Sequence, residues 1–152
     1  MIDYLNKFEM YLDKIKKRDI SRVFSQEIAF HEFLHLKIID VHSKRTEDKS
    51  VQVSELVESA GVSAQAVSKC LKALEAKEYI VRFTNKSDRR ITQVKLTDYG
   101  KKVFDITQEE IHEVMTRVFA EFTKAEYEML DNLTSKFLAL YEKTIDEMKI
   151  GG

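Results

Sequence analysis

The chain has 152 residues, a length typical of one domain or of a small core with helical extensions. Hydrophobic residues make up 43% and charged residues 34%, with no proline and four glycines, which favours long helices and excludes folds built from many tight β-turns. The single cysteine, Cys70, excludes an internal disulfide framework and a cysteine-rich zinc site. No apolar run approaches the roughly 20 residues of a membrane-spanning helix. The N-terminus does not resemble a secretory signal, so we expect a cytoplasmic protein with no membrane partner.

The net charge of −1 conceals an uneven distribution along the chain. Residues 49–102 hold eleven basic and six acidic side chains, whereas the remaining residues hold 14 basic and 20 acidic ones. A basic middle between acidic flanks is typical of a module that meets a polyanion. Random scatter gives a similar imbalance, so this interpretation needs support from a structural motif.

Two helices are expected before the basic segment. Apolar residues recur at helical spacing from Tyr4 to Ile15 and again over about residues 25–43. The polar stretch at 43–50 then predicts a loop. The second helix is expected to bury an apolar face that consists of Ile28, Phe33, Leu36, Ile39 and Val41.

The basic segment combines two short helices with a hairpin, and two long helices follow it. The predicted elements of the segment are, in chain order, helices over 54–60 and 64–77 and strands over 79–84 and 91–96 around a turn at 85–88. Thr97 is the expected N-cap of the next helix. Thr123 and Glu126 form a capping box at the start of the last one. The fold class predicted is mainly α with a small β-hairpin wing.

The two short helices have the chemistry of a helix-turn-helix. Gly61 allows the left-handed backbone that ends the first helix, and Ser63 caps the second through its hydroxyl. Apolar residues of both helices are expected to pack together: Leu56, Val57, Ala60, Val62, Val67, Cys70, Leu71 and Leu74. The outward face of the second helix then carries groups suited to base edges and phosphates in a major groove, namely Gln65, Ser68, Lys69 and Lys72. An ordinary helical pair with a solvated face is the alternative.

The hairpin turn adds three cations, Lys86, Arg89 and Arg90. Cations at the tip of a hairpin can reach an adjacent minor groove, where the negative potential favours arginine. A solvated charged turn is the alternative.

These residues resemble the MarR family of winged-helix transcription regulators. The resemblance covers about residues 25–148 and is carried by VSELVESAGVSAQAVSKCLKALEAKEYIVR, by SDRRITQVKLTDYG and by the two amphipathic helices after them. Among the family's more specific marks is an Asp-x-Arg wing followed by Leu-Thr-x-x-Gly, which here comprises Asp88, Arg90, Leu96, Thr97 and Gly100. Two residues depart from the family pattern: Glu78 stands where glycine is usual, and Val57 where alanine is commoner.

The resemblance implies a winged helix-turn-helix flanked by long dimerisation helices. Residues 1–48 and 98–152 would supply the dimerisation helices, and residues 49–97 the DNA-binding lobe. The dimer would bind double-stranded DNA at a pseudo-palindromic operator, more often as a repressor, and family members often respond to a small-molecule effector. Arg90 would enter the minor groove, braced by a salt bridge from Asp88. The DNA-binding residues expected are Ser63, Gln65, Ala66, Ser68, Lys69, Lys72, Lys86, Arg89 and Arg90, with no catalytic residue, metal ion or cofactor.

One motif points to a different class of protein. Residues 31–35, His-Glu-Phe-Leu-His, match the H-E-x-x-H signature of zinc proteases, in which two histidines share a helix face and Glu32 acts as general base. A catalytic zinc needs a third protein ligand, and the candidates Glu55 and Glu58 lie on the first helix of the DNA-binding pair. A zinc-dependent metallohydrolase using His31, Glu32 and His35 is therefore the disfavoured alternative. A regulatory metal site is a further alternative, involving His31, His35 or His42.

Cys70 is the only thiol of the chain, and thiol oxidation switches some members of this family. Cys70 is predicted on the apolar face between Val67 and Leu74, where a cysteine is usually an inert small hydrophobe. The family's peroxide sensors carry their reactive cysteine near the N-terminal helix, so a sensing role for Cys70 is disfavoured.

Overall fold

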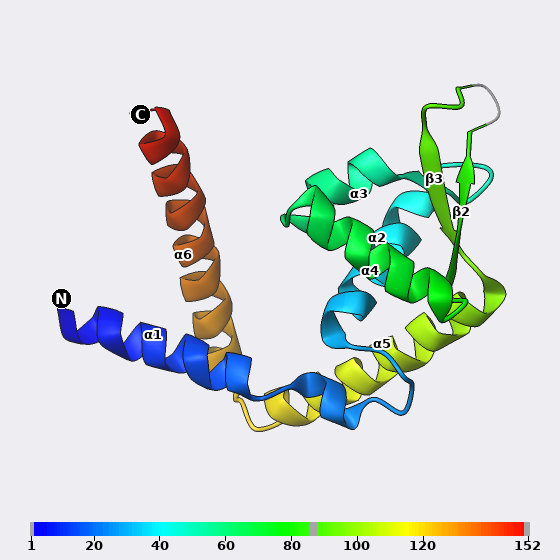
Figure 1. Cartoon of the computed structure of the whole chain (residues 1–152). Helices are drawn as coiled ribbons and strands as arrows, with labels where there is room; N and C mark the ends of the chain where they lie inside the picture. Colours follow the sequence, from blue (N-terminus) through cyan, green and yellow to red (C-terminus); the bar gives the residue numbers. More distant parts are fainter. Residues whose placement is uncertain (1, 86–87, 151–152) are drawn as a thin grey trace. The chain divides into compact units, whose positions relative to one another are not determined.

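The computed structural model describes residues 2–85 and 88–150 (Figure 1). Most of these residues are helical, and a small antiparallel sheet accompanies the helices, which confirms the predicted fold class. The chain divides into two compact units, Met1–Ile111 and His112–Gly152. The elements are α1 (Ile2–Lys17), the 3-10 helix η1 (Ile20–Val23), α2 (Phe30–Ser43), β1 (Val51–Gln52), α3 (Val53–Ala60), α4 (Ala64–Ala76), β2 (Ile80–Thr84), β3 (Thr92–Leu96), α5 (Asp98–Phe119) and α6 (Lys124–Ile150).

The sheet has the order β1-β3-β2, with β3 in the middle. In the predicted hairpin, Ile80 pairs with Leu96 and Thr84 with Thr92. The strand β1 was not predicted; it pairs Val51 with Val94 on the other side of β3. A strand of two residues carries no periodic signal in the sequence, because its existence depends on a partner that lies far along the chain.

The core of the first unit lies where α2 packs against α3, α4 and the sheet. Four residues of the predicted inner face, Ile28, Phe33, Leu36 and Ile39, are buried as expected, although Ile28 lies in the segment just before α2. Two expectations were wrong: Val41 on α2 and Val62 in the helix-turn-helix are exposed. Val62 follows Gly61, whose φ of 63° turns the chain after α3 and directs the next residue to solvent. Among the described residues, the buried hydrophobic side chains of this core also include Leu56, Val67, Leu71, Leu74, Ile80, Val94, Val103 and Phe104.

The second helix begins at Phe30, later than the predicted start near residue 25. Glu32 determines this start, since one of its carboxylate oxygens accepts a hydrogen bond of 2.9 Å from the Ala29 backbone N–H. The carboxylate thus accepts a hydrogen bond from a backbone N–H that has no carbonyl partner within the helix.

The junction between α4 and β2 is held by backbone hydrogen bonds. The Tyr79 N–H donates to the Leu74 carbonyl and the Glu78 N–H to the Glu75 carbonyl, a Schellman motif. Glu78 adopts a φ of 59°. This is the left-handed region in which glycine is favoured, so Glu78 holds a conformation that a glycine would adopt at lower cost.

The start of α5 is attached to the same junction. The predicted cap is confirmed, because the Thr97 hydroxyl accepts a 2.8 Å hydrogen bond from the Gly100 N–H and donates one of 2.7 Å to the Glu78 carbonyl. Gly100 lies so close to Tyr79 that a Cβ atom would stand 1.8 Å from the Tyr79 carbonyl oxygen. The close approach of α5 to β2 therefore requires glycine at this position.

The second unit consists of the last part of α5 and of α6. The predicted capping box is present, with Thr123 and Glu126 exchanging hydrogen bonds at the start of α6. Among the described side chains of α6 none is buried. Its exposed apolar residues include Leu130, Leu133, Phe137, Leu138, Leu140, Tyr141 and Met148. In the part of the chain described, no helix combines the length and apolar character needed to cross a bilayer.

Candidate nucleic-acid interface

The exposed face of α4 begins at a capped helix end. The Ser63 hydroxyl accepts a 3.2 Å hydrogen bond from the Ala66 N–H, as expected of an N-cap. Val67, Cys70, Leu71 and Leu74 bury the opposite face of α4 in the core. The side chains predicted to meet DNA from this helix are all exposed: Ser63, Gln65, Ala66, Ser68, Lys69 and Lys72.

Cys70 lies on the buried face of this helix, as predicted. Burial raises the pKa of its thiol to about 11, with the Glu32 carboxylate adding to the effect and Lys77 opposing it. Because the thiolate is the reactive form, the protonated thiol is inert near neutral pH. The geometry therefore gives Cys70 a packing role.

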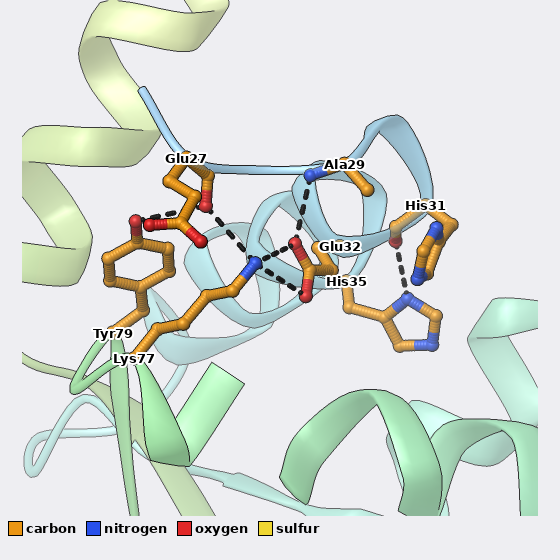
Figure 2. Close-up of polar contacts among 7 residues, drawn as sticks. All are labelled: Glu27, Ala29, His31, Glu32, His35, Lys77 and Tyr79. Carbon is orange, nitrogen blue, oxygen red and sulfur yellow. Dashed lines mark hydrogen bonds and ion pairs between the residues drawn. The ribbon is translucent and has the colours of Figure 1, made fainter. Parts of the chain in front are cut away.

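Lys77 anchors the C-terminal end of α4 to the first turn of α2 and to the segment before it (Figure 2). Its Nζ atom donates to both carboxylate oxygens of Glu32, at 2.8 and 3.0 Å, and to the Glu27 carbonyl oxygen at 3.1 Å. The Tyr79 hydroxyl donates to the same Glu27 carbonyl at 3.2 Å. The Glu32 side chain is 5% exposed, so this ion pair is buried on its acidic side. Lys77 was not predicted as a structural contact, since no local pattern relates it to Glu32.

This contact also accounts for the H-E-x-x-H motif. The Glu32 carboxylate is occupied by Lys77 and by the Ala29 N–H, so it is not free to act as a general base (Figure 2). His31 is exposed, whereas His35 is buried with its Nδ1 atom 2.7 Å from the His31 carbonyl oxygen. Among the described residues no three His, Cys, Asp or Glu side chains are grouped to hold a metal ion. These contacts give the motif a structural role at the start of α2.

The hairpin carries the second group of predicted residues. Arg90 forms an ion pair with Asp88, with 3.0 Å between Nη2 and Oδ2, and its Nε and backbone N–H both donate to the other carboxylate oxygen. The Arg90 guanidinium lowers the pKa of the Asp88 carboxyl, and the carboxylate in turn raises the pKa of Arg90. The Arg90 side chain is 90% exposed, and Arg89 is exposed as well. The predicted contact Lys86 lies outside the described residues.

Comparisons with known proteins agree with this architecture. A sequence model described as the MarR family matches residues 44–92. The helix-turn-helix transcriptional regulator YpoP of Bacillus subtilis is 31% identical over 131 residues, which cover 84% of this chain and 89% of YpoP. The regulator SarZ of Staphylococcus aureus is 25% identical over 128 residues, covering 84% and 83% of the two chains.

A similar solved structure is that of a MarR mutant from E. coli in complex with operator DNA, which has a TM-score of 0.73 and 22% identity and covers 90% of this chain and 95% of that one. That likeness concerns the fold. With the family match and the extent of the identity to YpoP, it leads to one conclusion: the chain belongs to the MarR family of winged helix-turn-helix transcriptional regulators.

Proposed function

We propose that this protein is a homodimeric regulator that binds double-stranded DNA at a pseudo-palindromic operator and represses nearby genes. The observation that carries the proposal is the exposed polar and cationic face of α4, followed in the same unit by a wing with an ion-paired Arg90. The similarity of the fold to a MarR protein bound to operator DNA supports it. Such a regulator would act in the cytoplasm, and residues 49–97 would form its DNA-binding lobe.

The residues of α4 divide between base contacts and phosphate contacts. Gln65 and Ser68 would hydrogen-bond to base edges in the major groove, and Ala66 would touch a thymine methyl group. Lys69 and Lys72 would attract phosphates, which makes binding dependent on salt. Ser63 stands at the N-terminal end of the helix, where backbone N–H groups favour an anion.

The wing would contact the minor groove through Arg90, with Lys86 and Arg89 adding charge. The two carboxylate oxygens of Asp88 hold the guanidinium in one orientation while leaving it exposed. An arginine that is already oriented loses less side-chain entropy when it binds.

Dimerisation would be carried by residues 1–48 and 98–152. A 27-residue helix, α6, exposes apolar side chains along its length in a single chain, and large exposed apolar surfaces usually mark an interface.

We expect sedimentation equilibrium to give twice the mass of one chain. Glutamate in place of Leu133 and Phe137 should shift the protein to the monomer, and an unchanged mass would exclude α6 from the interface.

The two DNA-binding lobes of such a dimer would reach successive major grooves about one helical turn apart. An effector would act by changing their spacing.

The proposal is tested by fluorescence anisotropy with the DNA upstream of the protein's own gene, against a scrambled duplex, over a series of salt concentrations. We expect binding that prefers the upstream DNA and weakens steeply with salt, because phosphate contacts release counterions. Equal binding of both duplexes at every salt concentration would contradict a sequence-specific regulator.

Arg90→Ala is expected to weaken operator binding about tenfold, the effect of losing one well-oriented arginine contact. The variant should remain folded, since the Arg90 side chain is almost fully exposed. Lys37→Ala is the matched control, because it removes an exposed cation that lies on α2, outside α4 and the wing. An equal loss in the two variants would assign the effect to general charge, and no loss in Arg90→Ala would remove the wing from the mechanism.

A further inference from the structure

We propose that Gln93 is a positioning residue for the wing and orients Arg90 through a chain of hydrogen bonds that begins in the loop before β1. The inference deepens the proposed function and rests on it, since Arg90 is the DNA contact through which Gln93 would act. The chain passes, in order, through Ser50, Gln93, Asn85, Asp88 and Arg90.

The chain starts at a buried and fully bonded anchor. Ser50 is completely buried, and its hydroxyl donates a 2.7 Å hydrogen bond to Asp48 Oδ1. Its backbone N–H donates to Asp48 and to the Thr46 hydroxyl, and that hydroxyl donates back to the Ser50 carbonyl at 2.8 Å. These contacts hold the Ser50 oxygen in a single place, with its proton already committed to Asp48.

Gln93 joins this anchor to the hairpin. It lies on the central strand β3, where its backbone faces Gln52 of β1 on one side and Phe83 of β2 on the other. Its Nε2 atom donates to the Ser50 hydroxyl oxygen at 3.0 Å, and its Oε1 atom accepts from Asn85 Nδ2 at 3.1 Å. The position needs a donor at one end and an acceptor at the other, which an amide supplies and a carboxylate does not.

Asn85 carries the link into the wing. Its side-chain oxygen accepts a 3.2 Å hydrogen bond from the Asp88 backbone N–H. The backbone N–H of Asn85 donates to the Ile91 carbonyl at 2.9 Å. The Asp88 carboxylate then binds the Arg90 guanidinium. The strand pairing ends at Thr84 and Thr92. Beyond that point Asp88 and Arg90 are held by these side-chain contacts together with the backbone hydrogen bonds that Ile91 exchanges with Asn85 and Asp88.

Without the Gln93 amide, strands β2 and β3 are expected to stay paired, but Asp88 and Arg90 should no longer be held in one orientation. An Arg90 side chain that is not oriented beforehand loses more entropy when it binds DNA, which lowers the affinity. Gln93→Leu, of similar size and without polar atoms, should therefore weaken operator binding about three- to tenfold. Gln93→Glu should weaken it at least as much, because a carboxylate there faces the Ser50 hydroxyl oxygen, whose proton is already donated to Asp48. Thr92→Val, a change at the adjacent exposed side chain of β3, is the matched control and should bind as the unchanged protein does.

The decisive measurement is a double-mutant cycle by fluorescence anisotropy, with thermal melting of every variant. If Gln93 acts through Arg90, Gln93→Leu should cause no further loss in the Arg90→Ala background. Two results would overturn the positioning role and leave the proposed DNA contact of Arg90 intact. In the first, Gln93→Leu causes its full loss of affinity in the Arg90→Ala background as well. In the second, Gln93→Leu and Gln93→Glu bind with unchanged affinity while Arg90→Ala binds more weakly. If instead Arg90→Ala binds normally, the proposed wing contact fails, and the positioning role fails with it.

Discussion

Replacing Gly100 with alanine is expected to lower the free energy of unfolding by about 3 kcal/mol. The added Cβ would stand 1.8 Å from the Tyr79 carbonyl oxygen and 2.6 Å from its carbonyl carbon, and both belong to backbone that cannot rotate away. The first turn of α5 has to move, and its movement also breaks the hydrogen bond of 3.1 Å from the Thr97 N–H to that carbonyl. Overpacking and the loss of this backbone hydrogen bond act together here.

Urea denaturation followed by circular dichroism measures this effect, and Gly61→Ala provides the matched control. Gly61 has a φ of 63° and no heavy atom within 4 Å of its added Cβ, so alanine there meets backbone strain without a clash. We expect that variant to lose about 1 kcal/mol, the cost of a left-handed non-glycine residue. Equal losses in the two variants would contradict the steric explanation at Gly100.

Lys77→Met is expected to cost about 2–3 kcal/mol of stability. The substitution keeps the aliphatic stem but leaves the Glu32 carboxylate, 5% exposed, without its counterion. Removing one partner of a fully buried pair costs more than this. The value is lower here because the Lys77 side chain is 29% exposed, so water reaches the ion pair from the lysine side.

A second substitution separates the charge from the packing. Glu32→Gln in the Lys77→Met background removes the stranded charge and keeps an oxygen that can accept from the Ala29 N–H. We expect this double variant to recover at least half of the lost stability in urea denaturation. Lys44→Ala is the control: it breaks the pair of Asp40 with a lysine that is 69% exposed and should cost less than about 1 kcal/mol. A double variant no more stable than Lys77→Met would show that the unpaired Glu32 charge is not the cause of the loss, and would assign it to the missing hydrogen bond from Lys77 to the Glu27 carbonyl.

Local patterns in the sequence were sufficient for the main elements. Helical spacing located α2, α3, α4, α5 and α6, because in each helix apolar residues recur every three to four positions and so gather on one face. Residues that act within one turn, such as Thr97 at α5 and Thr123 with Glu126 at α6, were also predicted correctly. Capping needs only neighbours three residues away, so its signal is contained in a short stretch of chain.

Contacts between distant segments were not predictable in this way. The strand β1 exists because β3 offers it a partner, and Glu32 is bound by a lysine at the end of another helix. The link from Ser50 to Gln93 likewise joins segments with no shared local pattern. The H-E-x-x-H motif shows the consequence: its spacing favours a metal site, yet the surrounding tertiary contacts occupy its glutamate and bury one histidine.

By itself, the sequence determined the order of the elements, the helix-turn-helix with its wing, and the residues that carry the family resemblance, since periodicity, capping and turn chemistry act over short distances along the chain. Only the tertiary structure decided which polar side chains are free to meet a partner. Gln65 and Lys69 remain exposed on α4, whereas Glu32 and Lys77 neutralise each other. The reason is physical: a charged group that leaves water must find a partner, and folding brings that partner from elsewhere in the chain.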